Sequence, residues 1–490
     1  MQNIEKNPTN HRANFPQITE RKFHKSPNES STNHRTKTQQ ITDFSKKMLD
    51  YQIFYVLLQR NQKSKIMKKY RQRIADILLK DKLEAFGAVL IEGPKWCGKT
   101  TTAEQQAKSV LYIADPAHLG QNKELARINP QFLLRGDSPR LIDEWQETPQ
   151  LWDAARFEVD HRGQMGQFVF TGSAVPIDSS KISHTGTGRF SWLRMRPMSL
   201  YESGESTGEI SLAEIIKGDK KLFGTSRLKL EDIAFLLCRG GWPQAVGMKT
   251  KAALAQAFAY LDAVVKSDIS RADNVQRDEL RARRLMRSYA RHQGTSVSMA
   301  ALRSDLANNE EQSFDETSIA SYLGALRRIF VVEDVQAWNP NLRSKTAIRT
   351  TDTRYFVDPS IGVAALELGP DDLMNDLNTF GLLFETLCMR DLRVYADALE
   401  GKIYHFRDSS GLECDAVLHL RAGIYGLIEI KLGGDKLIEE GAANLLKLQS
   451  KIDTDKMKAP AFLMVLTAVG DYAFQRKDGV YVVPIGSLKN

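Results

Sequence analysis

The stretch "FGAVLIEGPKWCGKTT" at residues 86–101 decides the fold of the first half of the chain. It begins with an apolar run typical of a buried strand, then satisfies the pattern G-x-x-x-x-G-K-[ST], and a helix is expected to follow. Gly93 and Gly98 allow backbone N–H groups to turn inward around phosphates, while Lys99 reaches the β and γ oxygens. Thr100 offers its hydroxyl to Mg²⁺. The stretch therefore predicts a phosphate loop that binds ATP together with Mg²⁺.

Strand-like and helix-like segments alternate from this stretch onward, which is the pattern of an α/β domain with a parallel sheet. Polar residues follow the ends of the predicted strands, where ligands bind in such sheets. Most contacts of a phosphate loop come from its backbone, so the side chains of its variable positions carry no predicted chemistry. The residues predicted to surround the nucleotide are Gly93, Pro94, Lys95, Trp96, Cys97, Gly98, Lys99, Thr100 and Thr101.

Two acidic residues end the apolar segment "LIDE" at residues 141–144, about 45 residues after the phosphate loop. Asp143 is predicted to hold the Mg²⁺ shell, and Glu144 to orient or deprotonate the attacking water. The next strand ends in "FTGS", where the Thr171 hydroxyl is a candidate sensor of the γ-phosphate. An ordinary strand-ending turn is the alternative for Thr171. Together these residues predict ATP hydrolysis in addition to ATP binding.

Arg189 follows the flexible segment "TGTG". An arginine in such a position can neutralise charge in the transition state as an arginine finger, in cis or across a subunit contact. A solvated surface arginine is the alternative, because loop arginines are usually exposed. The residues alone leave both interpretations open.

Composition describes a multidomain globular chain. Its 490 residues are 42% hydrophobic and 26% charged, and this length suggests about three domains. The four cysteines are far apart and imply neither a disulfide framework nor a zinc site, so a cytoplasmic, reducing location is expected. The apolar run at residues 51–58 is too short to span a bilayer, and we expect no membrane insertion.

Positive charge is concentrated near the N-terminus. The net charge is +8, of which residues 1–80 carry +11 and residues 81–490 carry −3. Residues 1–66 are rich in Asn, Thr, Ser, Gln and Lys and are predicted to be a disordered basic extension. Met67 opens a charged segment that runs into an amphipathic helix. Either Met67 is the natural start and 1–66 is a misread upstream extension, or 1–66 is a basic tail that contacts nucleic acid or an acidic partner.

Six motifs in a fixed order resemble those of a known family. They are "YRQRIADILL", "GPKWCGKTT", "RLIDEWQETPQLWDAARFEVD", "FVFTGSA", "GRFSWLRMRPMSLYE" and "GGWPQAV". Over about residues 67–490 the chain resembles the AAA-type P-loop ATPases of bacteria and archaea that carry a C-terminal domain of unknown function. The resemblance implies an AAA-like core, a helical lid, a winged helix and a terminal domain with a restriction-endonuclease-like fold. Arg189 matches the Gly-Arg motif of this family, which favours the arginine finger.

The sequence is accordingly divided into five parts. After the parallel-sheet region the periodicity turns helical, and three helical stretches followed by two short strands then suggest a winged helix. The predicted parts are a disordered basic extension (1–66), a P-loop AAA-like ATPase core (67–205), a helical lid (206–278), a winged helix (279–360) and a PD-(D/E)XK nuclease-like α/β domain (361–490).

The last part is assigned by the order of its elements and by the motif "IEIK". A helix, three strands, a helix and a strand give the order α-β-β-β-α-β, which is that of the PD-(D/E)XK nuclease core. This order is independent of the Glu-x-Lys motif formed by Glu429 and Lys431, so the two observations support each other.

The register of the hairpin before Glu429 predicts a metal site. If "RAG" at 421–423 forms a three-residue turn, Asp415 falls opposite Glu429, and such a like-charge pair is destabilising unless a cation binds between them. In this interpretation Asp415 and Glu429 hold Mg²⁺, Lys431 positions or activates the water, and Glu385 completes the metal shell. The alternative is the solvated face of a hairpin, on which Glu429 and Lys431 only maintain solubility.

Two functions remain open at this stage. The first is an ATPase that carries a metal-dependent nuclease-like module acting on DNA; the second is a regulatory ATP switch that binds DNA or a protein without cleavage. Candidates for DNA contact are the arginines of residues 281–287, together with Ser318, Ser321, Arg327 and Arg328; a solvated helix face is their alternative. A protein partner and an oligomer are compatible with the sequence, which demands neither.

Overall fold

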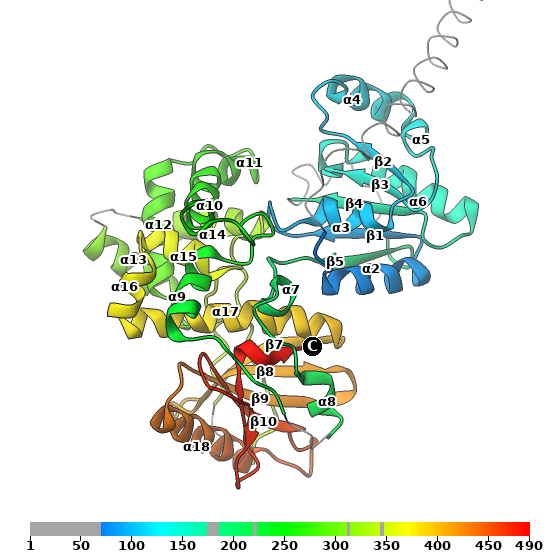
Figure 1. The fold of residues 1–490 in the computed structure, drawn as a ribbon. Coiled ribbons are helices and arrows are strands. Elements are labelled where there is room, and N and C mark those ends of the chain that lie inside the picture. Colours follow the sequence, from blue (N-terminus) through cyan, green and yellow to red (C-terminus); the bar gives the residue numbers. More distant parts are fainter. Residues whose placement is uncertain (1–69, 174–185, 219–222, 311–313, 344–346) are drawn as a thin grey trace, which may run out of the picture. The chain divides into compact units, whose positions relative to one another are not determined.

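A computed structural model describes residues 70–173, 186–218, 223–310, 314–343 and 347–490 (Figure 1). The predictions for residues 1–66 and for Met67 fall outside these ranges. Contacts group Arg71–Asn490 into one unit, and the description below concerns that unit.

Five parallel strands form the sheet predicted from the phosphate-loop stretch. They are β1 (Ala88–Glu92), β2 (Ser109–Tyr112), β3 (Arg140–Asp143), β4 (Phe168–Gly172) and β5 (Phe190–Arg194), in the order β2-β3-β4-β1-β5. Register pairs both Ile91 and Asp143 with Thr171 on the strand between them. The carboxyl ends of β1, β3 and β4 therefore lie at one edge of the sheet.

Helices cover both faces of this sheet, which explains why β1 is apolar along most of its length. Val89 and Ile91 pack with one group of helices, while Ala88 and Leu90 pack with the other. The first group is α2 (Ile74–Ala85) and α3 (Lys99–Gln106); the second includes α4 (Leu119–Ile128), α5 (Pro130–Leu133), the 3₁₀ turn η2 (Trp145–Glu147) and α6 (Gln150–Arg162).

The segment after β5 is only partly helical. Its elements are α7 (Leu200–Ser203), β6 (Ile210–Ser211), α8 (Leu212–Ile216), α9 (Leu230–Arg239), α10 (Thr250–Ala263), the π-helix η4 (Val264–Asp268) and α11 (Ile269–Arg271). Helical periodicity is confirmed from residue 230 onward. Among the described residues of 206–229 it is confirmed only for α8, and the neighbouring residues form β6 and irregular backbone. Ile210 and Leu212 join the core below α17, and β6 pairs with β13 (Leu488–Lys489) at the end of the chain.

Three helices predicted from periodicity are confirmed. They are α12 (Glu279–Arg291), α13 (Met299–Asn309) and α14 (Glu316–Arg328). The two segments that follow run antiparallel and meet in isolated bridges, Val332 with Phe356 and Val335 with Thr353, rather than as continuous strands.

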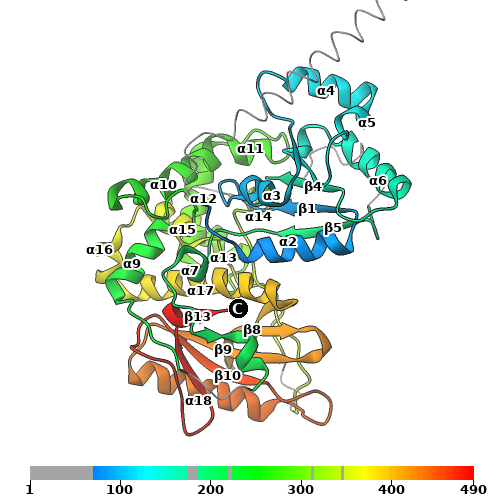
Figure 2. The ribbon, with the colours of Figure 1, turned by 45° about the vertical axis from the view of Figure 1, so that its right-hand side comes forward.

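The order α-β-β-β-α-β is confirmed in the last part of the chain. After α15 (Pro359–Leu366) and α16 (Pro370–Asn375) come α17 (Leu377–Ala398), β7 (Gly401–Arg407), β8 (Glu413–Leu420), the turn η5 (Arg421–Gly423), β9 (Tyr425–Lys431), α18 (Asp435–Lys451), β10 (Phe462–Thr467), β11 (Phe474–Gln475), β12 (Tyr481–Pro484) and the turn η6 (Ile485–Ser487). The strands β7 to β12 form one mixed sheet in the order β11-β12-β10-β9-β8-β7. α17 and α18 cover its opposite faces, as Figure 2 shows.

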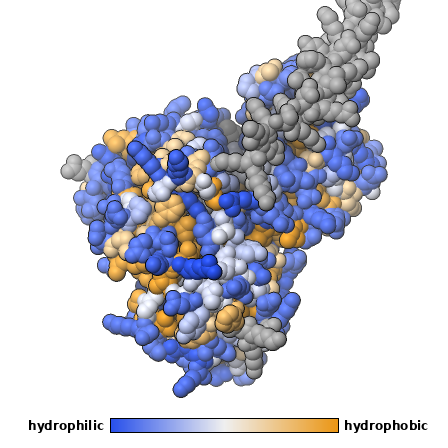
Figure 3. Space-filling view, viewed as in Figure 1, coloured by the Kyte–Doolittle hydropathy of each residue, from blue (hydrophilic) through white to orange (hydrophobic). Residues whose placement is uncertain are grey.

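Hydrophilic side chains cover much of the face seen in Figure 3, with hydrophobic ones scattered among them. Scattered apolar residues are ordinary on a protein surface and need no partner. Within the described ranges, no helix has both the length and the apolar character that crossing a membrane requires.

Candidate functional sites

The phosphate loop has the predicted conformation. Gly98 adopts a left-handed conformation with φ of 98°, and α3 begins at the next residue, so the N-terminal N–H groups of α3 face the loop. The ammonium of Lys99 turns into the loop and donates to the carbonyl oxygens of Gly93 at 3.0 Å and Pro94 at 2.8 Å. Thr101 is exposed in the first turn of the helix.

A carboxylate and two hydroxyls meet beside the loop. Thr100 Oγ1 donates to Asp143 Oδ1 at 2.7 Å, and Thr171 Oγ1 donates to the same oxygen at 2.6 Å. The meeting follows from strand order, because β4 lies between β1 and β3 and brings Thr171 between the other two. A set of hard oxygen donors at the N-terminus of a helix fits Mg²⁺ bound together with a phosphate.

Glu144 projects from the same edge in a left-handed conformation, with φ of 54°. Its Oε2 accepts a hydrogen bond from Ser173 Oγ at 3.2 Å and another from Gln146. The sequence predicted neither partner, although Ser173 ends the same "FTGS" segment as Thr171. Two neutral donors on one carboxylate oxygen fix the direction of the Glu144 side chain.

The tip of the loop contacts the helical segment that follows the sheet. Lys95 Nζ lies 2.6 Å from Asp268 on η4, and the ring of Trp96 packs edge-on against Tyr260, with centroids 5.5 Å apart. Tyr260 in turn stacks on the buried ring of Trp242. A π-helix inside a longer helix often marks a functional position. Trp242, which belongs to the motif "GGWPQAV", thus supports the loop through Tyr260.

Arg189 lies at the opposite edge of the sheet. Its carbonyl accepts from the N–H of Ala88, the first residue of β1, whereas the phosphate loop follows the last residue of β1. Strands rise about 3.3 Å per residue, so the length of β1 separates the two by roughly 15 Å. The side chain is half exposed and pairs with Asp160 at 2.9 Å. In this register Arg189 does not reach the loop of its own chain.

The predicted hairpin register of β8 and β9 is confirmed from His419, which pairs with Tyr425, to Ala416, which pairs with Ile428. Asp415 and Glu429 follow directly after this last pair, at a point where β8 shifts its register against β7. The turn between β8 and β9 is η5, in which Ala422 is left-handed with φ of 63°. The face is not solvated, however, because Glu429 is only 1% exposed.

Lys431 lies between the two carboxylates. Its ammonium is 2.6 Å from Glu429 Oε2 and 3.5 Å from Asp415 Oδ2, while the backbone N–H of Ile430 donates to Asp415 Oδ2 at 2.7 Å. Glu429 Oε1 is buried and has no hydrogen-bond partner. Buried polar atoms are nearly always paired, so this oxygen has the capacity to accept one more ligand.

Burial dominates the electrostatics of this site. Desolvation, together with the nearby charge of Asp415, raises the pKa of Glu429 to about 8. Burial alone would lower the pKa of Lys431, but the carboxylates of Asp415 and Glu429 outweigh it and raise that pKa. Lys431 therefore stays charged, while Glu429 resists ionisation.

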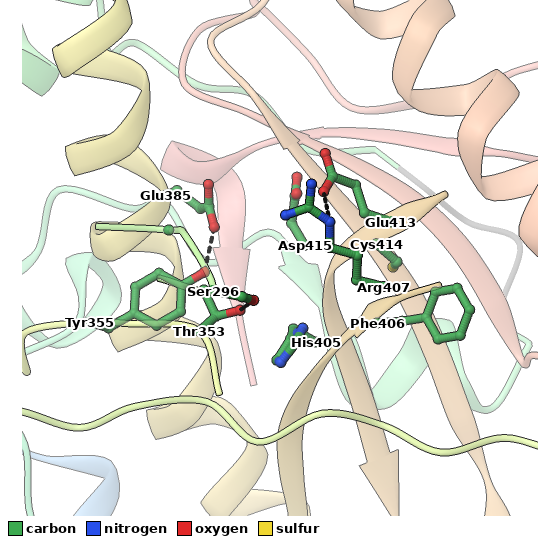
Figure 4. A pocket seen from close by; sticks show the side chains of 11 residues that line it. Ser296, Thr353, Tyr355, Glu385, His405, Phe406, Arg407, Glu413, Cys414 and Asp415 are labelled. Carbon is green, nitrogen blue, oxygen red and sulfur yellow. Dashed lines mark hydrogen bonds and ion pairs between the residues drawn. The ribbon is translucent and has the colours of Figure 1, made fainter. Parts of the chain in front are cut away.

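Glu385 lies on α17 in a small cavity that Asp415 also lines (Figure 4). It accepts a hydrogen bond from the buried hydroxyl of Tyr355, and desolvation with the charge of Asp415 raises its pKa well above the usual range. Within the described ranges, no three His, Cys, Asp or Glu side chains are close enough together to hold a metal ion. The structure thus brings Asp415, Glu429 and Lys431 together but leaves Glu385 at a distance from a common metal.

The two carboxylates nevertheless fit a divalent cation. Mg²⁺ is commonly held by one or two carboxylates, with substrate phosphates and waters as its remaining ligands. Asp415 and Glu429 are hard oxygen donors on neighbouring strands, and one of their oxygens is buried without a partner. A cation bound by Asp415 and Glu429 would share their oxygens with the ammonium of Lys431.

Three of the arginines predicted to contact DNA are engaged within the protein. Arg283 pairs with Asp262, Arg287 with Glu367 and Arg327 with Asp334, each at 2.6 Å. Ser321 accepts from Arg277, and the N–H of Ser318 caps α14 through Asp315. These guanidinium groups are therefore largely neutralised by acidic neighbours.

Family models match three successive parts of the chain. Residues 85–204 match an AAA domain, residues 230–372 a domain of unknown function (DUF8612), and residues 380–488 another domain of unknown function (DUF4143). No curated protein matches. A solved structure, the Walker-type ATPase PABY2304 of Pyrococcus abyssi, is similar at 12% identity over 60% of this chain and 96% of that chain, with a TM-score of 0.36.

Proposed function

We propose that this chain, which carries an AAA-type module at residues 85–204, binds ATP with Mg²⁺ and hydrolyses it at the phosphate loop. The observation that carries the proposal is the meeting of Thr100, Asp143 and Thr171 at the edge of the sheet where the loop lies. Both hydroxyls donate to the same oxygen of Asp143, so three oxygen atoms that could bind Mg²⁺ lie together beside the loop.

Each residue has a role that follows from its position. Bound ATP supplies the γ-phosphoryl group, and Mg²⁺ offsets its charge. The N–H groups at the start of α3 bind phosphate oxygens, and Lys99 exchanges its two carbonyl partners for them. Thr100 and Asp143 hold the cation. Glu144, whose direction is fixed by Ser173, orients the attacking water and accepts its proton.

The test is Lys99→Ala in the full-length protein, with phosphate release and binding of a fluorescent ATP analogue as measurements. We expect turnover to fall to background, because the other lysine of the loop, Lys95, is paired with Asp268. Lys456→Ala, which removes an exposed lysine paired with Asp453, is the control and should hydrolyse ATP normally. Equal turnover in wild type and Lys99→Ala would contradict the proposal.

We also propose that Asp415, Glu429 and Lys431 form a metal-dependent nuclease-like site that acts on DNA. The unpartnered buried oxygen of Glu429 and the nuclease-like order of elements support it. Asp415 and Glu429 would hold the cation, and Lys431 would position a water for attack on a phosphodiester. In the competing function, a regulatory ATP switch without cleavage, Lys431 is simply the permanent counter-ion of both carboxylates. Its 2.6 Å contact with Glu429 favours that second function.

One experiment separates these two functions. Wild type and Glu429→Ala are incubated with single- and double-stranded DNA and with Mg²⁺ or Mn²⁺, each with and without ATP. Cleavage by wild type that disappears in Glu429→Ala supports the nuclease. If neither protein cuts, or if both cut equally, the regulatory switch is retained and the nuclease is rejected.

Arg189 leads to a proposal about assembly. Since it lies far from the loop of its own chain, it can serve as an arginine finger only in a neighbouring copy. ATP turnover per chain should then rise with protein concentration in wild type and stay flat in Arg189→Ala. A concentration-independent turnover in wild type would leave Arg189 as a surface residue.

A further inference from the structure

Arg73 joins the phosphate loop to the segment that follows β5. Its guanidinium is buried and donates to three acceptors: Cys97 O at 2.8 Å, Arg196 O at 2.8 Å and Glu202 Oε1 at 3.0 Å. Because the guanidinium is a rigid planar fork, it holds these acceptors in a fixed mutual geometry. The equally buried carboxylate of Glu202 compensates its charge.

The loop also rests on Met195. A Cβ added at Gly93 would lie 2.0 Å from Met195 O, and Cys97 Sγ lies 3.6 Å from the same oxygen. No side chain therefore fits between the first glycine of the loop and this carbonyl. The position of the loop depends on the position of the segment that contains Met195 and Arg196.

Arg196 fastens this segment to two other parts of the chain. Its Nε and Nη2 donate to the two carboxylate oxygens of Glu333 at 2.9 and 2.7 Å, and its Nη1 donates to Asp397 on α17 at 2.6 Å. Burial alone would raise the pKa of Glu333, but the charges of Arg196 and Arg393 hold it well below the usual range. Glu333 is therefore ionised at neutral pH, and the bidentate pair stays formed.

The helix α17 extends from this contact to the C-terminal carboxylate site. Asp397 lies near its end and Glu385 three turns earlier, so the two are about 18 Å apart along one rigid element. Asp391, between them, accepts from the N–H of Leu200 at 2.8 Å. The segment after β5 is thus held at two points on the same helix that carries Glu385.

We infer that Arg73 and Arg196 are positioning residues of the nucleotide site, which set the phosphate loop according to the position of α17. The inference rests on the proposed function of the loop in binding ATP. A ligand that displaces Glu385 moves α17, and the contacts of Arg196 transmit this movement to the loop. By thermodynamic reciprocity, nucleotide binding must then change the affinity of the Glu385 site to the same degree.

The first test weakens the contact between Arg196 and α17 at Asp397, the more exposed of the two acidic partners of Arg196. Asp397→Asn removes the charge of a partner whose side chain is one-third exposed, so the protein should still fold. We expect the Kd for a fluorescent ATP analogue and the KM for ATP to rise about fivefold, the lower end of typical coupling effects, while kcat changes by less than about twofold. The matched control is Glu439→Gln, which breaks an exposed pair with Arg476 and should change neither value.

A second readout needs no nucleotide. Amide hydrogen exchange of residues 93–100 in the nucleotide-free protein should be at least about threefold faster in Asp397→Asn than in wild type, because exchange reports local opening. Arg196→Lys should give the same increase, since an ammonium cannot replace the bidentate contact with Glu333. Unchanged exchange and unchanged nucleotide affinity in both variants would overturn the inference.

The coupling itself is measured by a double-mutant cycle of Glu385→Gln and Asp397→Asn, with nucleotide Kd as the readout. We expect Glu385→Gln to shift the Kd at least about threefold in the wild-type background and by less than half of that when Asp397 is already replaced. Strictly additive effects would overturn the inference while ATP binding by wild type stands. Absence of ATP binding in wild type would overturn the proposed function and this inference together.

Discussion

The phosphate loop and the Glu-x-Lys site are both predicted from short motifs, but they are built differently. In the loop, the functional lysine bonds to its own segment: Lys99 donates to the carbonyls of Gly93 and Pro94. In the C-terminal sheet, Asp415 and Glu429 come from two strands and meet only through the register of a hairpin. A contiguous motif contains its own geometry, whereas a dispersed one depends on the fold around it.

The two sites also differ in exposure. Asp143 and Glu144 are partly exposed at an open sheet edge and receive hydroxyl or amide hydrogen bonds. Glu429 is buried beneath α18 beside Lys431, and its pKa is raised to about 8. The first environment suits carboxylates that exchange ligands during turnover. In the second, ionisation of Glu429 is unfavourable unless a cation binds to the carboxylate.

The largest expected effect concerns the nucleotide site at the open edge of the parallel sheet. Glu144→Gln removes the proton acceptor but keeps the hydrogen-bonding shape of the side chain, so kcat for ATP should fall on the order of 10²–10³-fold with KM nearly unchanged. Single-turnover phosphate release measures the loss. A KM that rises as much as kcat falls would show that Glu144 binds the nucleotide instead of activating water.

The next effect concerns the buried site and pH. The pKa of Glu429 in the folded protein, about 8, lies above its ordinary value of 4.5, so the folded state binds more protons between these values. Its contribution to the free energy of unfolding is complete below pH 4.5 and is lost as pH rises through 8. Glu429→Gln should therefore be more stable than wild type at pH 8 by on the order of 1–3 kcal/mol, and less different at pH 5.

Denaturant unfolding in EDTA at pH 5 and pH 8 measures the difference in free energy of unfolding between wild type and Glu429→Gln. A second series with Mg²⁺ tests whether the carboxylates bind a cation. If the two carboxylates hold a cation, added Mg²⁺ stabilises wild type at pH 8 and leaves Glu429→Gln unchanged. A pH-independent difference between the two proteins would show that Lys431 already keeps Glu429 ionised in the folded state.

Much of the first site was predictable because its signals are local. An apolar strand, two glycines and a lysine specify the loop, and the spacing to Asp143 specifies the neighbouring strand. The partner of Thr171 required the strand order, which the sequence does not state. Ser173 and Trp242 were missed because their contacts join segments far apart in the chain.

The second site was predictable up to its register and no further. Alternation along β8 and β9 predicted Asp415 beside Glu429, and the turn at Ala422 and the pairing of Ala416 with Ile428 agree with that register up to the preceding pair. Alternation cannot tell whether a polar face is solvated or covered by a helix, which here is decided by α18. For the same reason the sequence could not place Glu385, whose position depends on the packing of α17 against Tyr355.

A smaller effect is expected from Thr171→Val, a near-isosteric change at a buried position. Asp143 Oδ1 would keep Thr100 as a donor but lose the 2.6 Å bond from Thr171, so its direction would be less fixed. We expect a loss of about tenfold in kcat, equivalent to about 1.4 kcal/mol, with unchanged ATP affinity. If Thr171 is only part of a strand-ending turn, kcat will equal that of wild type.

The smallest effect is expected where α18 covers the buried site. A Cβ at Gly441 would lie 3.3 Å from Val465 Cγ2, 3.4 Å from Glu429 Cβ and 3.5 Å from Lys431 Cε, so Gly441→Ala fits with slight crowding. Alanine gains about 1 kcal/mol of helix propensity, which the crowding should offset to within about 1 kcal/mol. Gly324→Ala in α14, where nothing lies within 4 Å, is the matched control and should keep the full gain. Thermal unfolding of both variants measures the difference. An equal gain in both variants would mean that α18 can shift to accept the added methyl group. The packing of α18 over Glu429 would then be loose.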